Sequence, residues 1–398
     1  MSELEQRRNG PAWADPEFSR CPIDYLARQA VPAPYYDPVN QGWIVTDYET
    51  VKHALTSSSY VKDVSNAAPC PYTTRQKEAT GQSFIFMDDP DRGRIRRILA
   101  PLFTPRRVQQ LAPIIEGICS ALLDHAPTDR AFNLADAYCR PLSVLTIATI
   151  LGFDEDRQAD LLAWSEDLER EFGPQHPEAQ NRSRASHLAL VNYLDALLGQ
   201  QRPPEGTAVA FLAEALLNRS VTYEEALSTL VALLVAGNVS TSDLLSNAVY
   251  NLLSHPKQLH AYLKGQVSAA QVIEETLRYD PPLTVVDRIA GLDAPLPFVT
   301  PGEWVWPCLS TANRSPQLND NPDRFNVTRD RVRHLSFGAG SRLCLGAPLA
   351  RLEAQIGLDM LFRRFPALVL SPSDESVRHD KPSFHGFAKL WVIGQGAG

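Results

Sequence analysis

Apolar positions along the chain recur mostly with helical spacing, and the strongest such pattern lies in the second half. Thr222-Tyr-Glu-Glu225 forms a capping box, in which side chains three residues apart satisfy the free backbone N–H groups at a helix start. Apolar residues follow until the stop at Ser254-His255-Pro256. At about 1.5 Å per residue, a helix of about 33 residues is roughly 50 Å long and spans a whole domain. The pattern therefore predicts one long, buried, central helix.

Several shorter helices accompany this one in the predicted secondary structure. They are expected at residues 48–55, 91–103, 107–125, 142–151, 154–172, 183–198 and 348–364, and a further helix follows the capping box Ser268-Ala-Ala-Gln271 and ends before Pro281. A strand is expected at 43–46 and small hairpins within 287–306, while the polar stretch 57–83 is predicted to be a long loop. No internal repeat or low-complexity linker divides the chain. The prediction is a mainly α fold with small β-sheets in a single large domain, residues 1–398, with an N-terminal lead-in of about residues 1–40.

The composition places the chain among soluble globular proteins. Of its 398 residues, 44% are hydrophobic and 21% are charged, which excludes disordered, collagen-like and coiled-coil classes. Lys and Arg number 38 against 46 Asp and Glu, and the net charge of −8 argues against a nucleic-acid binder. No apolar run reaches the roughly 18 residues of a membrane span, and the charged stretch 1–30 excludes a secretory signal. Six scattered cysteines without a CxxC pair fit a reducing compartment, so we expect a cytoplasmic protein. From the charge and the short apolar runs, we expect that it contacts neither nucleic acid nor membrane.

One cysteine lies in a setting that favours a metal-binding thiolate. Residues 335–346 read Leu-Ser-Phe-Gly-Ala-Gly-Ser-Arg-Leu-Cys-Leu-Gly and lead directly into a predicted helix. Gly338, Gly340 and Gly346 permit a backbone with positive φ and the close approach of a flat ligand. Backbone N–H groups at the helix start would point at the sulfur of Cys344 and stabilise its anionic form. For a cysteine taken in isolation, an inert buried thiol is the alternative.

This loop resembles the haem-thiolate signature of the cytochrome P450 family, here of the soluble bacterial type. The residues in register with that signature are Phe337, Gly338, Arg342, Cys344 and Gly346. The resemblance implies a P450-like fold in which haem b lies between the central helix and the loop 335–346, with the Cys344 thiolate as the axial ligand of the iron. A dinucleotide-binding loop is excluded, because Gly338-x-Gly340 lacks a third glycine three residues on.

Two further segments resemble structural marks of the same family. Glu275-Thr-Leu-Arg278 matches its Glu-x-x-Arg pair, in which residues three apart meet on one helix face. Pro322-Asp-Arg324-Phe325 is similar to the segment whose arginine, here Arg324, closes a triad with that pair. The resemblance implies that these three side chains hold the fold behind the haem and take no part in the chemistry.

Four arginines match positions that bind the carboxylates of the haem. Arg342 lies within the cysteine loop, and Arg288 follows the Glu-x-x-Arg helix. In Asp89-Pro-Asp-Arg-Gly-Arg-Ile-Arg96, Arg96 stands at the family's arginine position and Arg92 where a histidine is usual. The fork of donors on a guanidinium suits a carboxylate, so all four are expected to hold the propionates.

The middle of the predicted central helix carries the residues expected next to dioxygen. Ala236-Gly-Asn-Val-Ser-Thr241 resembles the family's Ala/Gly-Gly-x-Asp/Glu-Thr, which implies that Ala236 lies on the haem and that Gly237, Ser240 and Thr241 are catalytic. Glycine inside a helix costs about 1 kcal/mol relative to alanine. Room for dioxygen at Gly237 is the expected reason, and tight helix packing is the alternative.

The acid of the family's acid–alcohol pair is missing. Val239 occupies the acid position and cannot relay a proton, whereas Ser240 keeps the hydroxyl of the alcohol position. Three kinds of chemistry stay open, in this order of preference: ordinary monooxygenation through another proton path, peroxide-driven chemistry, and oxidative coupling of substrate radicals.

The substrate pocket is expected to be mostly apolar. By resemblance it is lined by Ile85, Phe86, Ala232, Ala236, Ser240, Thr284, Val285 and Phe387, and each of these positions is equally compatible with ordinary core. An apolar or aromatic small molecule is the predicted substrate. His385 lies in the same C-terminal turn as Phe387 and is expected to be structural.

Electrons must come from a separate protein, because the chain contains no flavin or iron–sulfur motif. The resemblance implies NAD(P)H, a ferredoxin reductase and a ferredoxin. Basic residues would attract such an acidic carrier, or form a solvated face together with the propionate ligands; they are Arg92, Arg94, Arg96, Arg97, Arg106, Arg107, Arg342 and Arg351. The leading prediction is a monooxygenase that inserts one atom of dioxygen by hydroxylation or epoxidation. A peroxide-driven or oxidative-coupling enzyme and a haem-based sensor are the alternatives.

Overall fold

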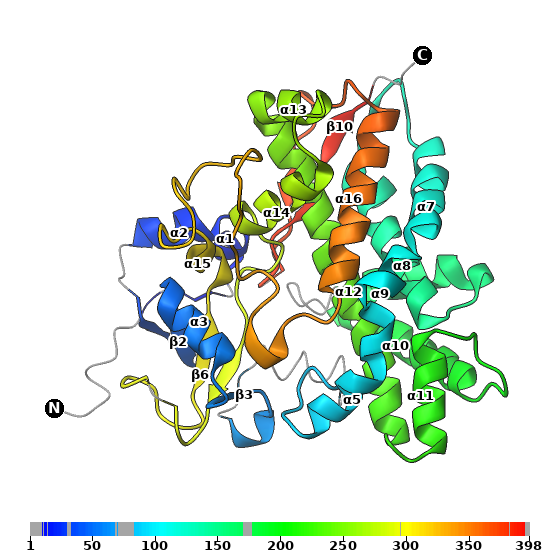
Figure 1. Ribbon diagram of the computed structural model, residues 1–398, viewed down its shortest axis with the longest axis vertical. Helices are drawn as coiled ribbons and strands as arrows, with labels where there is room; N and C mark the ends of the chain where they lie inside the picture. The colour runs from blue at the N-terminus through cyan, green and yellow to red at the C-terminus, as the bar shows by residue number, and fades with distance from the viewer. Residues whose placement is uncertain are drawn as a thin grey trace.

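The chain folds around one long helix, α12, with most other helices on one side of it and a small sheet on the other (Figure 1). The computed structural model describes residues 10, 12, 13, 15–29, 33–67, 70, 83–169, 177–294, 296–381 and 383–394. Its α-helices are α1 (Pro16–Arg20), α2 (Pro22–Gln29), α3 (Tyr48–Thr56), α5 (Asp91–Leu99), α6 (Pro105–Gln109), α7 (Ala112–Asp124), α8 (Arg140–Leu151), α9 (Gln158–Glu169), α10 (Pro177–Leu198), α11 (Ala208–Leu217), α12 (Tyr223–Ser254), α13 (Pro256–Leu263), α14 (Ala269–Tyr279), α15 (Leu309–Asn313) and α16 (Ala347–Arg364). Its strands are β1 (Tyr35–Asp37), β2 (Gly42–Val45), β3 (Tyr60–Val61), β4 (Ala131–Asn133), β5 (Arg288–Ala290), β6 (Trp304–Pro307), β7 (Val369–Leu370), β8 (Val377–Arg378), β9 (Phe387–Lys389) and β10 (Trp391–Ile393). The predicted mainly α class with small sheets is confirmed.

Helix α12 is the predicted central helix. Its capping box is present, since the Thr222 side chain accepts from the Glu225 N–H and the Thr222 N–H donates to the Glu225 carboxylate at 2.8 Å. The helix spans 32 residues and packs against α8, α14 and α16. Among the helices of the described chain, α12 alone is long and apolar enough to cross a membrane, but 67% of its apolar stretch is buried within the fold. It is therefore the core helix that the capping pattern predicts.

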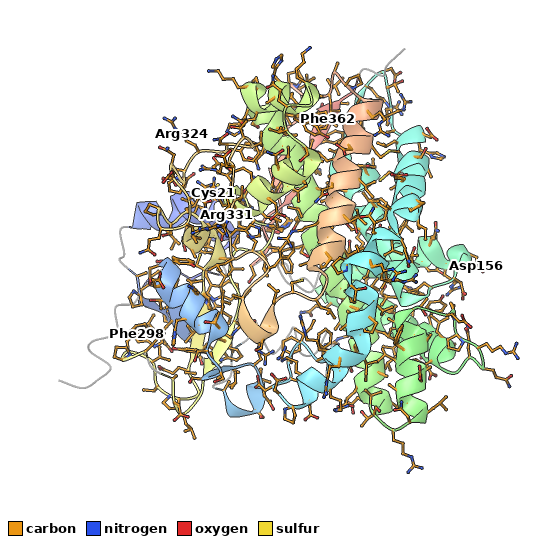
Figure 2. All side chains as sticks on the ribbon, in the orientation of Figure 1. Cys21, Asp156, Phe298, Arg324, Arg331 and Phe362 are labelled. Carbon is orange, nitrogen blue, oxygen red and sulfur yellow. The ribbon has the colours of Figure 1, made fainter. Side chains whose placement is uncertain are left out.

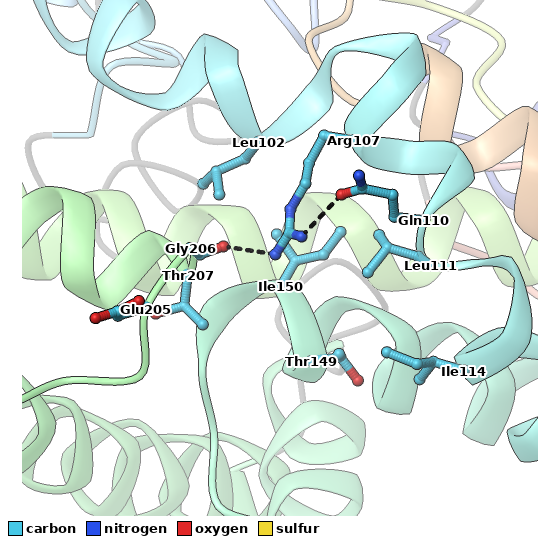
Figure 3. A pocket seen from close by; sticks show the side chains of 10 residues that line it. All are labelled: Leu102, Arg107, Gln110, Leu111, Ile114, Thr149, Ile150, Glu205, Gly206 and Thr207. Carbon is cyan, nitrogen blue, oxygen red and sulfur yellow. Dashed lines mark hydrogen bonds between the residues drawn. The ribbon is translucent and has the colours of Figure 1, made fainter.

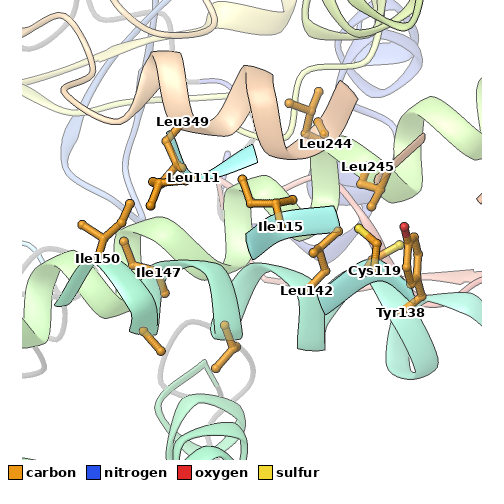
Figure 4. Close-up of a cluster of buried hydrophobic side chains, with 14 of the residues drawn as sticks. Leu111, Ile115, Cys119, Tyr138, Leu142, Ile147, Ile150, Leu244, Leu245 and Leu349 are labelled. Carbon is orange, nitrogen blue, oxygen red and sulfur yellow. The ribbon is translucent and has the colours of Figure 1, made fainter. Parts of the chain in front are cut away.

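The core is packed to contact distance where α12 crosses α8 and α16 (Figure 4). Leu142 of α8, Leu245 of α12 and Leu349 of α16 belong to one buried cluster. A Cβ at Gly357 of α16 would lie 2.9 Å from the Leu142 side chain and 3.0 Å from that of Leu245. Such contacts leave no room for a larger residue. The crossing fixes the position of α16, and with it the cysteine loop that precedes this helix.

A five-stranded sheet lies on the other side of the molecule (Figure 1). The strand order is β1-β2-β6-β5-β3, with β2 parallel to β6 and β5 antiparallel to β6. The β5–β6 pairing confirms the predicted hairpin structure within 287–306. The predicted N-terminal lead-in packs onto this sheet, where the ring centroids of Trp13 and Trp306 are 4.7 Å apart. The sheet thereby places Arg288, the first residue of β5.

Prolines divide two segments that the periodicity predicts as continuous helices. Residues 107–125 span α6 and α7, with Pro113 in the first turn of α7. Residues 91–103 form α5 and then a 3₁₀ turn, Ala100–Phe103, that holds Pro101 in its first turn. Proline has no N–H to donate, so it fits a first turn better than a helix interior.

Other boundaries also differ from the prediction. Helices α11 and α13 are not predicted by the pattern, and α10 begins at Pro177, before the expected residue 183. The predicted loop 57–83 contains β3, and its residues 68, 69 and 71–82 lie outside the described chain, as do residues 170–172 of the helix expected at 154–172.

The predicted pair of Glu275 and Arg278 forms a buried ion pair. Arg278 donates to the Glu275 carboxylate from Nε at 2.7 Å and from Nη2 at 2.8 Å, and both side chains are fully buried. The predicted third member is wrong, because Arg324 is exposed near the edge of the molecule (Figure 2) and offers its backbone carbonyl to Arg278. Arg329 closes the triad instead, with Nε 3.1 Å from Glu275 Oε1. The chain between the two arginines turns so that the later side chain points inward.

Candidate functional site

The cysteine loop is a tight turn held by its own backbone. The Cys344 N–H donates to the Phe337 carbonyl at 2.9 Å, and the Gly338 N–H donates to the Leu335 carbonyl at 2.7 Å. Gly338 has φ of +71° and Gly340 has φ of +69°, and a Cβ at Gly340 would lie 3.0 Å from the backbone of Thr56 in α3. Both glycines are therefore required, as predicted.

The positive φ expected at the third glycine of the loop is absent. Gly346 has φ of −80°, and a Cβ at this position would meet nothing within 4 Å. It is the residue that precedes α16, so its backbone already approaches helical geometry and needs no left-handed conformation.

The sulfur of Cys344 lies at the start of α16, among groups that act in favour of its anion. Desolvation by the surrounding protein atoms is the largest effect and leaves the pKa of the Cys344 thiol raised, while hydrogen bonds from the backbone N–H groups of Gly346 and Ala347 and the positive charges of Arg96 and Arg351 offset part of that rise. Cys344 and Cys21 are the exposed cysteines of the described chain. An open sulfur facing backbone donors is suited to bind a metal as thiolate.

Behind the loop, an ion-pair network holds the ring of Phe337. The guanidinium carbon of Arg351 lies 4.4 Å from the Phe337 ring centroid, and Arg351 Nε donates to Glu274 at 2.6 Å. His334 lies 3.1 Å from the same carboxylate. Burial favours the neutral acid, but hydrogen bonds from His334 and Arg351 lower the pKa of Glu274 to about 2. The carboxylate therefore stays ionised and keeps Arg351, and with it Phe337, in place. Glu274 and His334 were not predicted.

Two of the four predicted arginines lie on α5. Arg92 is buried, donating to the Ser341 carbonyl at 2.8 Å and to Asp89 at 2.6 Å, while its Nε has no hydrogen-bond partner. Arg96 is half-buried and makes no hydrogen bond or ion pair with the described residues. Burial and the charge of Arg92 lower the pKa of Arg96, while the field of Cys344 raises it. These unused donors are available to an anion.

The other two arginines join the same cluster. Burial lowers the pKa of Arg288 to about 10, and this buried side chain donates to the Asp287 carbonyl at 2.7 Å. Arg342 donates to the Met87 carbonyl at 2.7 Å and forms an ion pair with Asp88. All four predicted propionate ligands are thus brought together, because Arg92 and Arg342 are among the charges that act on Arg288, and Arg92 also acts on Arg96.

Lys62 is a fifth cation of this cluster that was not predicted. It is buried, and its Nζ lies 2.7 Å from Asp287 Oδ1. At formal charges, the five cationic side chains outnumber the three carboxylates of Asp88, Asp89 and Asp287 by two. Two propionates would balance this excess. Together with the open sulfur of Cys344 and the unpartnered Arg92 Nε, the residues present therefore fit a haem.

In the middle of α12, two of the predicted residues carry open surface. Ala236 is exposed and Ser240, one turn later, is half-buried, with its hydroxyl donating to the Ala236 carbonyl at 3.2 Å. Thr241 and Val239 are buried. Ala232 is completely buried, so the expectation that it lines a pocket is wrong: the open face begins one turn further along the helix.

The structure supports the alternative reason for Gly237. A Cβ on this residue would lie 2.8 Å from the Ile147 side chain of α8. Close packing of α12 on α8 therefore accounts for the glycine, and the expectation that it makes room for dioxygen is wrong: the absent side chain faces α8. Its neighbour Asn238 donates to the Ser165 hydroxyl of α9 at 2.5 Å, which joins α9 to the open part of α12.

The remaining predicted pocket residues divide into open and buried positions. Ile85 is half-buried, whereas Phe86 is buried beneath Lys62, with Nζ 5.4 Å from the ring centroid. Thr284, Val285 and Phe387 are buried too, so the expectation that they line the pocket is wrong. The partly exposed side chains are those of Leu283 and Val286, which adjoin Thr284 and Val285, and of Phe384, three positions before Phe387. Alternation along an extended chain decides which neighbour faces inward, and the sequence pattern does not reveal the phase.

His385 is structural, as predicted. Its Nε2 lies 2.6 Å from Asp280 Oδ1. The same carboxylate accepts from Arg378 at 2.9 Å and from Asn251 at 3.0 Å. Burial opposes ionisation, but the charges of Arg378 and His385 lower the pKa of Asp280 far below its usual range. The carboxylate is a fixed anion that joins α12, α14 and the C-terminal hairpin.

A separate small cavity of about 230 Å³ contains none of the predicted catalytic or haem-binding residues (Figure 3). Arg107 crosses it and donates to Gln110 at 3.2 Å and to the Gly206 carbonyl at 3.1 Å. Arg107 therefore ties α6 to the loop before α11.

Of the basic residues predicted to attract an electron carrier, most are committed to internal contacts. Arg94 bridges Asp91 and Glu225, and Arg92, Arg342 and Arg351 are paired as described above. Arg97 and Arg106 remain exposed and form no ion pair with the described residues. The exposed Leu343 lies beside Cys344.

Comparisons with known proteins agree with this arrangement. The family model described as Cytochrome P450 matches residues 269–389. Cytochrome P450 107B1 of Saccharopolyspora erythraea is 33% identical over 352 residues, covering 84% of this chain and 85% of its own length. The 6-deoxyerythronolide B hydroxylase of the same organism is 30% identical, covering 84% and 85%. The crystal structure of P450BioI in complex with an acyl carrier protein ligated to hexadec-9Z-enoic acid superposes with a TM-score of 0.84 at 31% identity, covering 95% of this chain and all of that one.

Proposed function

The chain belongs to the cytochrome P450 family and is a monooxygenase, and on this premise we propose that it uses haem b, held by Cys344, to hydroxylate or epoxidise an apolar or aromatic small molecule. The observation that carries the proposal is the joint placement of the open Cys344 sulfur, facing two backbone N–H groups, and a buried cluster with two excess positive charges. A thiolate ligand and two propionates are what this pair of features would accommodate.

Some residues of the site would bind the haem, and others form the open face of α12. Bound through Cys344, the haem supplies the iron at which dioxygen is activated and electrons are received. Gly346 and Ala347 stabilise the thiolate through their N–H groups. Lys62, Arg92, Arg96, Arg288 and Arg342 would hold the propionates. On α12, the small side chain of Ala236 leaves the open face accessible, and the hydroxyl of Ser240 can hold a water or pass on a proton.

The first experiment is a Soret titration of haem-loaded protein against terpenoid, aromatic, fatty-acid and macrolide-like compounds. We expect a thiolate-type Soret band and a low-to-high-spin shift with one class, because that ligand displaces water from the iron. Cys344→Ser should lose the thiolate-type band, whereas Cys21→Ser, at the other exposed cysteine, should keep it. Absence of the band in the unaltered protein under every loading condition would refute the proposal.

The electron donor is proposed to be a ferredoxin, reduced from NAD(P)H through its reductase. The exposed charges of Arg97 and Arg106 and the exposed side chain of Leu343 beside Cys344 support an acidic carrier with an apolar centre. The double change Arg97→Glu, Arg106→Glu should lower the rate of ferredoxin-dependent reduction about tenfold at low salt. Arg184→Glu, at an exposed arginine of α10, is the matched control and should leave the rate unchanged. Equal rates for both variants would exclude this surface.

A second candidate, peroxide-driven or oxidative-coupling chemistry, rests on Val239. This buried side chain stands where the resemblance leads one to expect the proton-relaying acid. Val239→Glu separates the two candidates. If monooxygenation is native, the ratio of product formed to NADH consumed should rise in the variant, whereas an enzyme with another mechanism should gain nothing.

A further inference from the structure

A buried carboxylate–histidine pair lies one helical turn from Ser240. Asp243 Oδ2 of α12 is 2.8 Å from Nε2 of His379, which follows β8. Both side chains are almost fully buried, with 6% and 5% of their surface exposed. A pair of this kind can hold a proton and release it.

The carboxylate is next to the position where the acid is missing. Asp243 follows Val239 by four residues and Ser240 by three on the same helix. Side chains three and four residues apart are neighbours on a helix surface, with Cβ atoms roughly 5–6 Å apart. Asp243 therefore adjoins both the valine and the half-buried hydroxyl.

The C-terminal turn fits closely around this carboxylate. A Cβ at Gly386 would overlap Asp243 Oδ1, and the His379 N–H donates to the Gly386 carbonyl at 3.2 Å. Gly386 lies between His385 and Phe387, within the turn whose half-buried Phe384 has open surface. The pair thus lies where α12 meets the turn.

The partners of Asp243 differ from those of the neighbouring buried carboxylate. Asp280 is saturated by Arg378, His385 and Asn251, which makes it a fixed anion. Within the described chain, Asp243 forms an ion pair with His379 alone, and His379 Nδ1 has no hydrogen-bond partner. Asp243 also acts on Cys139, whose pKa burial raises, so that thiol stays neutral. Asp280 is thus saturated, whereas the pair of Asp243 and His379 retains a buried ring nitrogen that is free to accept a proton.

We propose that Asp243 and His379 form the proton relay of this enzyme and take over the task of the acid absent at Val239. The proposal rests on the proposed monooxygenase function, since reduction of dioxygen consumes protons. His379 takes up a proton at its buried Nδ1 from a water that reaches this atom and gives its Nε2 proton to Asp243, and Asp243 gives a proton to a water held by the Ser240 hydroxyl. One proton moves from solvent to the site and no electron is transferred. Asp243 and His379 are thus positioning residues that act through Ser240.

The test compares Asp243→Asn with Asp280→Asn, its matched control. In Asp243→Asn, with a surrogate ferredoxin and reductase, kcat should fall about a hundredfold, and its solvent isotope effect and pH profile should change. Asp280→Asn should lower stability and leave the pH profile unchanged. If Asp243→Asn proves unstable, His379→Gln, which keeps a hydrogen-bond donor, should give the same kinetic change.

Two further measurements distinguish proton transfer by Asp243 and His379 from a purely structural role of this pair. The first is the ring ¹⁵N titration of His379 in the reduced, carbon monoxide-bound protein. Its midpoint should coincide with that of the kinetic profile and move with it in Asp243→Asn. The second is rescue, because adding Val239→Glu to Asp243→Asn should restore most of kcat by returning an acid to the neighbouring turn.

A failure of the relay and a failure of the proposed function give different experimental results. An unchanged pH profile and isotope effect in Asp243→Asn, or no rescue by Val239→Glu, would overturn the relay while the thiolate-type Soret band and turnover persist. Loss of that band in the unaltered protein would overturn the proposed function itself.

Discussion

Glu353→Gln should remove a loss of stability that the protein otherwise undergoes as the pH rises from acid to mildly alkaline values. Glu353 lies on α16 in the core, only 2% exposed, and accepts a hydrogen bond from the Ser143 hydroxyl of α8 at 2.7 Å. Within the described chain, the groups that act on this carboxyl are the surrounding apolar atoms and the Ser143 hydroxyl, and no cation is among them. Burial raises its pKa from 4.5 to about 8, and the hydrogen bond from Ser143 offsets only part of that rise.

The size and sign of the effect follow from proton linkage. Between pH 4.5 and about 8 the folded protein keeps a proton on Glu353 that the unfolded chain has released, so the free energy of unfolding falls as the pH rises. The stabilising contribution of the neutral acid is complete below pH 4.5 and lost above the folded pKa. At 1.36 kcal/mol per pKa unit, the loss reaches roughly 5 kcal/mol above pH 8.

Urea unfolding of wild type and Glu353→Gln between pH 4.5 and 9 measures this term. Glutamine keeps the shape and the acceptor for Ser143 but cannot ionise. The unfolding free energy of the variant minus that of the wild type should therefore increase by about 1.4 kcal/mol per pH unit in the middle of the range. Ser143→Ala is the control: it keeps the ionisable acid, so its stability should still fall as the pH rises, and the fall should extend to higher pH because the hydrogen bond that lowers the pKa of Glu353 is lost. Parallel pH profiles for wild type and Glu353→Gln would refute the reasoning, because they would mean that Glu353 is ionised in the folded protein.

Three further predictions concern residues that support the haem-binding site. Glu275→Gln should destabilise the protein by about 3–5 kcal/mol in urea unfolding, because it leaves buried cations without their carboxylate; a loss under about 1 kcal/mol would contradict the triad. Lys62→Met should speed transfer of haem to apomyoglobin about tenfold, since one charge that balances a propionate is lost while Asp287 is left unpaired; an unchanged rate would remove Lys62 from the haem-binding cluster. Gly340→Val should lower the fraction of protein that takes up haem, because of the left-handed backbone and the contact with α3, whereas Gly346→Ala should match the wild type in the same absorbance assay; equal loading of both variants would show that the loop tolerates side chains at Gly340.

Local chemistry made a large part of the fold and site predictable. The capping box at Thr222 and the stop before Pro256 define α12 because they act within a few residues of the helix ends. Gly338, Gly340 and Cys344 belong to one short loop, so their conformations and hydrogen bonds are set by neighbours in the chain.

The sequence pattern did not predict contacts between residues that are distant in the chain. Arg329, and not Arg324, reaches Glu275, because the direction of each side chain depends on how the intervening segment turns. Lys62 lies in a segment that reads as polar loop, and only its approach to Asp287, 225 residues away, shows that it is a buried member of the charge cluster.

The sequence by itself determined which residues are chemically able to act: one thiolate in a glycine-rich turn, a set of arginines for two carboxylates, and a hydroxyl without its usual acid at Val239. Which of these residues face a shared space, and which side chains compensate for the missing acid, depends on the three-dimensional fold. Gly237 faces α8, Thr284 and Val285 turn into the core, and Asp243 meets His379 across 136 residues of chain. The physical reason is that residue chemistry is a local property, whereas burial and pairing depend on the packing of elements that are far apart in the chain.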